Sequence, residues 1–147
     1  MIATELFSEE RALPSYVTNS KLEERLNQNQ MYTLNKKYLL RNKDGEIIET
    51  PSQAVYRMAR TMANVESRYG TNQERIDQLT EEFYHLIDNS EFSPAGRIWT
   101  NAGTQITGLF NCYVLPVEDN MDIDVPDSIY ITLAKAAVIH KNGGGTG

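Results

Sequence analysis

The chain has 147 residues and a formal net charge of −6, and its 40% hydrophobic and 23% charged residues are typical of a soluble globular protein. No apolar run approaches the roughly 18 residues of a membrane span, and the first residues lack the layout of a signal peptide, so we expect a cytoplasmic protein without a membrane partner. The acidic balance contains no basic stripe, which argues against nucleic acid as a partner. The single cysteine, Cys112, excludes an internal disulfide bond and a cysteine zinc site, and no metal site is expected.

Polar, weakly periodic residues 1–30 predict a mobile lead-in with one short helix near residues 21–26. Residues 32–48 contain two apolar groups separated by Asp44 and Gly45, a pair that favours a tight turn because glycine tolerates a positive φ. We therefore expect a small hairpin in this segment.

Two amphipathic helices are predicted next. Thr50 and Pro51 predict the start of the first helix, because threonine caps and proline suits the first helical position. Gly70 predicts its end, and Thr71 with Glu74 predicts a second capped helix that runs to about residue 88. The apolar face of the first helix is interpreted as core packing and consists of Val55, Met58, Met62, Val65 and Tyr69.

The following segment contains less regular patterns. Pro94, Gly96 and Gly103 predict an irregular turn over residues 92–104, with side chains held inward. Residues 101–104 offer small polar groups and close backbone approach, which suits a hydroxyl-rich or phosphate-bearing ligand.

Residues 108–117 predict a buried strand with Asn111 and Cys112 at its centre. Neighbouring side chains of a strand point to opposite faces, so if both residues serve one site, one of them contributes its backbone. Composition alone favours a small buried hydrophobe as the interpretation of Cys112.

An acidic loop at 118–127, a helix at 128–141 and a glycine cluster at 143–147 complete the chain. The loop does not match the spacing of a calcium-binding loop. The glycines require close approach to the backbone, yet they match neither the Walker motif nor the dinucleotide fingerprint.

Four ordered motifs lie in this second half: Pro-Ala-Gly-Arg-Ile at 94–98, Asn-Ala-Gly-Thr at 101–104, Asn-Cys-Tyr-Val-Leu-Pro-Val-Glu-Asp at 111–119 and His-Lys-Asn-Gly-Gly-Gly-Thr-Gly at 140–147. Together they resemble the start of a ribonucleotide reductase catalytic chain, and the nearest pattern is the adenosylcobalamin-dependent class II type. The resemblance extends over the chain from about residue 32 onward.

The resemblance implies an α/β fold that is α+β in a fragment. A mobile lead-in (1–30) and an N-terminal helical domain with a small hairpin (31–91) would precede residues 92–147. These last residues would supply the first strand and helix of a ten-stranded α/β barrel, truncated at Gly147. A truncated gene, a split gene and an intein would each give this ending.

The resemblance also implies site residues. Cys112 would be the catalytic half of a dithiol pair that reduces the ribose 2′ position. Ile98, Asn111, Cys112 and Gly145 would bind the substrate, with residues 98–103 close to it. Asp119 and Asn120 would begin an effector-binding site, although residues 122–126 resemble a short insertion there.

The implied activity is the conversion of ribonucleotides, with diphosphates expected, to deoxyribonucleotides by thiyl-radical chemistry with adenosylcobalamin. The implied partners are the ribonucleotide, a deoxynucleotide effector, a thioredoxin-type reductant, the remainder of the enzyme and a second copy in a homodimer. The chain alone is expected to be inactive, because the other catalytic groups would lie beyond Gly147. Two alternatives stay open: a non-catalytic helical domain that binds a partner, and the large chain of a class I reductase.

Overall fold

The computed structural model describes residues 12–106 and 108–147. They fall into two compact units, residues 12–106 (the helical unit) and residues 108–147 (the C-terminal unit). Within the helical unit, the elements in chain order are α2 (Ser15–Thr18), α3 (Leu22–Arg25), α4 (Gln28–Lys37), α5 (Pro51–Ala63), the 3₁₀ helix η1 (Asn64–Tyr69), α6 (Gln73–Asp88) and α7 (Gly96–Asn101).

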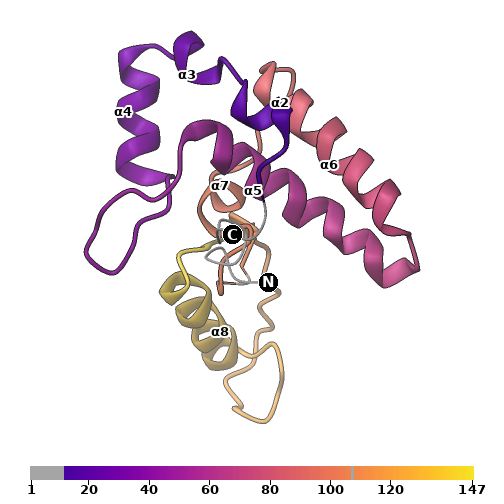
Figure 1. Cartoon of the computed structure of the whole chain (residues 1–147). Helices are drawn as coiled ribbons and strands as arrows, with labels where there is room; N and C mark the ends of the chain where they lie inside the picture. The colour runs from indigo at the N-terminus through magenta and orange to yellow at the C-terminus, as the bar shows by residue number, and fades with distance from the viewer. Residues whose placement is uncertain (1–11, 107) are drawn as a thin grey trace. The chain divides into compact units, whose positions relative to one another are not determined.

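Helices α5 and α6 lie side by side and form the core of the helical unit (Figure 1). Helix α5 begins as predicted. The side chain of Thr50 accepts a hydrogen bond from the Gln53 amide at 3.3 Å, the Gln53 side chain accepts one from the Thr50 amide at 2.8 Å, and Pro51 occupies the first turn. The sequence therefore encodes this helix start locally.

The apolar stripe predicted for the first helix ends early. Val55 and Met58 are fully buried, whereas Val65 and Tyr69 are 44% and 79% exposed. The chain tightens into η1 after Ala63, and a 3₁₀ helix advances by three residues per turn, so the spacing of an α-helical face is lost. Gly70 then ends the helix with φ +80°, as predicted.

Asn72 caps α6, and the prediction of Thr71 was wrong. The Asn72 side chain accepts a hydrogen bond from the Arg75 amide at 2.9 Å. Both residue types cap well, so local sequence does not choose between adjacent candidates. The buried positions of α6 recur at every fourth residue and are Ile76, Thr80, Tyr84 and Asp88.

The hairpin predicted over residues 32–48 is shorter than expected, because α4 occupies its first half. Only the Arg41–Ile47 bridge joins the two arms in antiparallel fashion. The turn between them is the predicted one, since Gly45 adopts φ +85°.

Partly buried hydrogen bonds and an ion pair attach α3 to the core of the helical unit. Glu23 accepts hydrogen bonds from the amide and the hydroxyl of Ser52 at 3.0 and 2.8 Å. Arg25 pairs with Asp88 at 2.9 Å. Burial raises the pKa of the Glu23 carboxyl, but the hydrogen bonds from Ser52 lower it by more. The pKa of Glu23 therefore lies below the ordinary 4.5.

The short helix predicted near residues 21–26 is present as α3, and its Leu22 is buried. The first eleven residues of the predicted lead-in at 1–30 lie outside the described residues. In its described part, α2, α3 and the start of α4 follow one another, and Val17 of α2 is 3% exposed.

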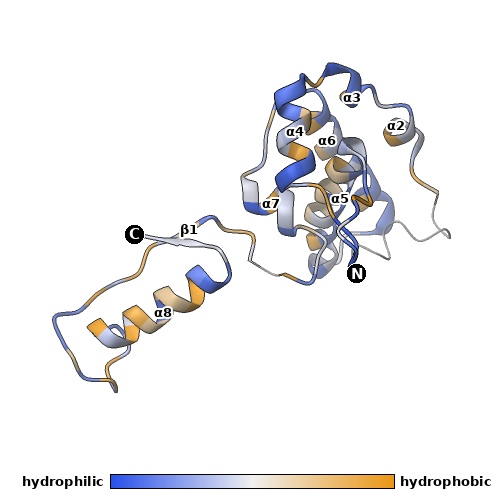
Figure 2. Ribbon diagram, turned by 90° about the vertical axis from the view of Figure 1, so that its left-hand side faces the viewer, coloured by the Kyte–Doolittle hydropathy of each residue, from blue (hydrophilic) through white to orange (hydrophobic). Residues whose placement is uncertain are grey.

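The C-terminal unit is a β-α-β arrangement. Strand β1 (Cys112–Tyr113) pairs in parallel with β2 (Gly145–Thr146), and α8 (Ile129–Lys141) connects them. The expectation of a buried strand over 108–117 was wrong, because two residues pair and Val114 is 90% exposed. Figure 2 shows α8 as apolar along most of its length.

The buried position of α8 is a threonine. Ile129 and Leu133 are 41% and 64% exposed, whereas Thr132 is 7% exposed. Thr132 donates a hydrogen bond from its hydroxyl to the Pro116 carbonyl at 2.9 Å, which turns this position inward. Among the helices that the structure describes, none has the length and apolar composition needed to cross a membrane.

Candidate functional site

Cys112 and Gly145 are partners in the parallel register of β1 and β2. The Gly145 amide donates a hydrogen bond to the Asn111 carbonyl at 2.7 Å, and the Gly147 amide donates to the Tyr113 carbonyl at 3.0 Å. Residues paired across strands present their side chains to the same face, so the thiol of Cys112 lies on the face where Gly145 has no side chain.

The sulfur of Cys112 is exposed, which contradicts its interpretation as a small buried hydrophobe. A Cβ atom placed on Gly145 would lie 3.7 Å from this sulfur, an ordinary van der Waals contact. A methyl group would therefore fit at position 145. Because glycine has none, one side of the Cys112 thiol stays uncovered.

Gly144 is tightly enclosed, in contrast to Gly145. A Cβ atom on Gly144 would lie 2.7 Å from Cγ2 of Ile139 and 2.9 Å from Cε2 of Tyr113. The preceding Gly143 adopts φ +79°, which reverses the chain after α8. The glycine cluster thus lets β2 run close to both α8 and β1, as the sequence predicted.

Asn111 contributes its backbone to this arrangement, because its carbonyl accepts the hydrogen bond from Gly145. The sequence had predicted that Asn111 and Cys112 cannot both aim side chains at one pocket from a strand. On the other side of β2, the His140 ring nitrogen Nε2 and the Thr146 hydroxyl lie 2.9 Å apart. This contact ties the end of α8 to β2.

Asp119 and Asn120, the predicted effector-binding residues, lie beside the start of α8. The Asn120 carbonyl accepts a hydrogen bond from the Ile129 amide at 2.9 Å, and its side chain accepts one from the Asp122 amide at 2.7 Å. Asn120 therefore satisfies an amide of the first turn of α8. The cap residue Ser128 is fully buried, and its hydroxyl has no hydrogen-bond partner among the described residues.

Ile98 belongs to α7 in the helical unit, where an irregular turn had been predicted. Residues 96–101 form a short helix instead. Ile98 is half-buried and lines an apolar hollow of about 260 Å³ between α5, α6 and α7, together with Met58, Ala59, Met62, Phe83, Leu86, Ile87, Phe92 and Pro94.

Sequence reasoning missed a buried ion pair beside α7. Arg57 and Glu49 are both fully buried, and the guanidinium donates to the two carboxylate oxygens from Nε at 2.9 Å and Nη2 at 2.8 Å. The same guanidinium donates to the carbonyls of Ala102 at 2.5 Å and Trp99 at 3.0 Å. The available signal was an arginine inside the apolar stripe of a helix, since a buried charge requires a partner.

The predicted site residues thus fall into separate groups. The structure brings Asn111, Cys112 and Gly145 together, and it places Asp119 and Asn120 at the start of α8 in the same unit. Ile98 is a residue of the helical unit. In the part of the chain that the structure describes, no three His, Cys, Asp or Glu side chains are placed to share a metal ion.

Comparison with known proteins decides the family. Residues 24–107 match the model of the ribonucleotide reductase all-alpha domain. The chain belongs to the ribonucleotide reductase family. This result confirms the resemblance and the helical nature of the N-terminal region, which is the all-alpha domain of a reductase.

Individual reductases give the same answer. The vitamin B12-dependent ribonucleoside-diphosphate reductase of Mycobacterium tuberculosis (strain CDC 1551 / Oshkosh) is 36% identical over 114 residues, which are 78% of this chain and 16% of that protein. The enzyme of the same name from Thermoplasma acidophilum is 28% identical over 176 residues, covering 84% of this chain and 22% of that protein. The ribonucleoside-diphosphate reductase large subunit of African swine fever virus (strain Badajoz 1971 Vero-adapted) is 31% identical over 115 residues, covering 78% and 13%. The chain thus spans between about an eighth and a fifth of the length of these reductases.

Proposed function

We propose that this chain supplies the N-terminal part of a ribonucleoside-diphosphate reductase and that Cys112 is one of its reducing thiols. The observation that carries the proposal is the match of residues 24–107 to the reductase all-alpha domain. The exposed thiol of Cys112 beside Gly145 supports the role of the cysteine, because a reducing thiol must reach the ribose.

The proposed reaction balances with one dithiol per nucleotide. The ribose C2′–OH bond breaks and a C2′–H bond forms, while the hydroxyl leaves as water. The two electrons come from Cys112 and a second thiol, whose S–H bonds are lost as an S–S bond forms between them. A thioredoxin-type dithiol then reduces this disulfide by thiol–disulfide exchange, so that the cysteine pair can act again.

The remaining site roles are proposals for individual residues. Asn111 and Gly145 would contact the substrate through the backbone that joins β1 to β2. Ile98 would contact the substrate from the apolar hollow of the helical unit. Asp119 and Asn120 would begin the site of a deoxynucleotide effector.

The cofactor of the complete enzyme is proposed to be adenosylcobalamin, which supplies the radical that starts the reaction. The names of the Mycobacterium and Thermoplasma relatives support this proposal. Two hollows of the helical unit, of about 600 and 260 Å³, are lined by uncharged residues without an imidazole. We therefore assign no cobalamin contact to them.

We also propose that the complete enzyme is cytoplasmic, takes diphosphates and forms homodimers. A class I large chain is the second candidate, favoured by the 31% identity to a viral large subunit. A non-catalytic helical module that binds a partner is the third, favoured by the exposed apolar side chains of α8. Turnover with adenosylcobalamin and no second kind of subunit would separate the first from both.

The test uses a chimeric reductase in which this chain replaces the aligned segment of the Mycobacterium enzyme. We expect the chimera to reduce ribonucleoside diphosphates with adenosylcobalamin and a thioredoxin-type donor. Cys112→Ser should abolish multiple turnover, because one of the two thiols is then missing. The Mycobacterium enzyme with its own segment is the positive control. Undiminished steady-state turnover by the Cys112→Ser chimera would reject the role of the cysteine.

A further inference from the structure

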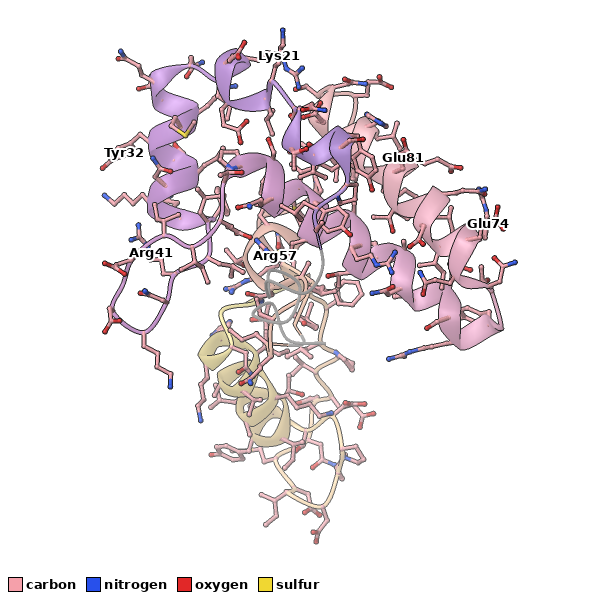
Figure 3. The ribbon with its side chains drawn as sticks, viewed as in Figure 1. Lys21, Tyr32, Arg41, Arg57, Glu74 and Glu81 are labelled. Carbon is pink, nitrogen blue, oxygen red and sulfur yellow. The ribbon has the colours of Figure 1, made fainter. Side chains whose placement is uncertain are left out.

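Arg57 makes contacts that join three separate segments of the helical unit. Its guanidinium is fully buried and binds Glu49, which precedes α5, with two hydrogen bonds of 2.8 and 2.9 Å. Glu49 in turn accepts a hydrogen bond from the Leu40 amide at 2.8 Å. The charge of Arg57 is therefore neutralised and held in one orientation, and Figure 3 shows Arg57 in the interior of the helical unit.

The other two bonds of Arg57 fix the end of α7. A six-residue helix leaves its last carbonyls without partners in the helix, and Arg57 donates to two carbonyls of this region, those of Trp99 and Ala102. A cation at a helix C-terminus is also favoured by the helix dipole. The chain leaves α7 at Ala102 with ψ 130° and turns at Gly103 with φ +74°, so Arg57 holds the point where its direction changes.

We propose that Arg57 is a positioning residue for the substrate: by holding the Trp99 and Ala102 carbonyls, it fixes residues 98–103 in the conformation that contacts the nucleotide. This inference rests on the proposed function, in which Ile98 contacts the substrate, and on the resemblance, which implies that residues 98–103 lie close to it. Arg57 itself is fully buried and touches no substrate. The planar fork of arginine is needed because one group must bind a carboxylate and two carbonyls together.

Arg60 provides a matched control on the same helix. It is also buried, at 3% exposure, and it carries the same charge three residues further along α5. Its guanidinium pairs with Asp77 and reaches Thr80, both on α6. The Asp77 side chain is 55% exposed, so lysine in place of Arg60 perturbs a partly exposed ion pair of the same helix, away from the end of α7.

The experiment compares Arg57→Lys and Arg60→Lys in the chimeric reductase described above. Lysine keeps the charge and loses the fork, so Arg57→Lys should raise KM for the ribonucleoside diphosphate roughly ten- to a hundredfold. Arg60→Lys should leave KM unchanged. Amide hydrogen exchange of the same proteins should be faster at Ala102 and Thr104 in Arg57→Lys alone, since both amides are hydrogen-bonded within this turn.

Each outcome is decisive. Equal KM values for the two variants at equal thermal stability would overturn the positioning role. If Arg57→Lys does not fold, Glu49→Gln retains Arg57 and weakens its anchor, and it should raise KM in the same direction; an unchanged KM would overturn the inference. An inactive chimera without substitutions would instead overturn the proposed function, and the inference with it.

Discussion

The two units of this chain bury different kinds of side chain. The helical unit contains every buried apolar residue of the described chain, including Val55, Met58 and Tyr84, which are at 0% exposure. In residues 108–147, all of which the structure describes, the buried side chains are the hydroxyl residues Ser128 and Thr132. The helical unit is thus a core in its own right, whereas the C-terminal unit is held by backbone pairing and close glycine contacts.

The composition of α8 explains this contrast. A surface helix has one apolar stripe, but a helix that is apolar all round belongs inside a larger protein. Leu133 and Val138 of α8 are 64% and 59% exposed. Such a helix suits a chain that is covered by further protein, either the rest of the proposed reductase or the partner of a binding module.

The largest expected effect breaks the core of the helical unit. Met58→Ala removes a side chain at 0% exposure and should lower the free energy of unfolding by about 2–5 kcal/mol. Leu133→Ala in α8 should change it by less than about 0.5 kcal/mol, because this side chain is already in water. Urea unfolding followed by circular dichroism measures both. Equal losses would contradict the exposure of Leu133.

The next effect sharpens the role of the glycines in the C-terminal unit. Gly144→Ala places a methyl group 2.7 Å from Ile139 and should cost about 1–3 kcal/mol, which loosens β2. Gly145→Ala should preserve the pairing and slow the reaction of Cys112 with a disulfide reagent, since the methyl group lies 3.7 Å from the sulfur. Amide hydrogen exchange at Gly147 measures the loosening of β2 in Gly144→Ala, and the rate of thiol labelling measures the access to Cys112 in Gly145→Ala. Faster labelling in Gly145→Ala would contradict the geometry.

A smaller effect concerns the helix starts of the core. Thr50→Ala and Asn72→Ala each remove a cap that accepts an amide hydrogen bond, and each should cost about 1 kcal/mol. Thr71→Ala is the matched control and should be nearly neutral, because Asn72 makes the capping bond of α6. Thermal unfolding of the three variants decides the matter. A loss in Thr71→Ala equal to that in Asn72→Ala would restore the cap predicted from sequence.

The smallest effect is the pH dependence contributed by Glu23. Its folded pKa lies below 4.5, so its hydrogen bonds to Ser52 contribute full stability above the unfolded pKa. This contribution should disappear as the pH falls through the folded pKa. In Glu23→Gln, the free energy of unfolding should fall less steeply as the pH drops below about 5. An identical acid dependence of the wild type and Glu23→Gln would contradict the assignment.

Local patterns predicted the helix starts and turns well where a single residue type decides them. The helix start at Thr50 and Pro51, the left-handed Gly70 and the turn at Gly45 all occur as expected, because each depends on neighbours in the chain. The motifs around Cys112 likewise identified the reductase family, which the match of residues 24–107 confirms.

Burial depended on contacts that no local pattern contains. Arg57 and Glu49 are eight residues apart. Arg57 also donates hydrogen bonds to the carbonyls of Trp99 and Ala102, which lie more than forty residues away in the chain. The run around Cys112 was expected to be a buried strand. It is a two-residue strand in which Cys112 is exposed and Tyr113 is half-buried, and among the described residues it pairs with β2 alone.

The sequence by itself determined the capped helices, the glycine turns and the family, since each is written in adjacent residues. The tertiary structure decided which charges are buried and which face of Cys112 is open. These depend on distant segments meeting in space, and the free energy of a buried ion pair or an exposed thiol is set by the atoms around it rather than by its neighbours in the chain.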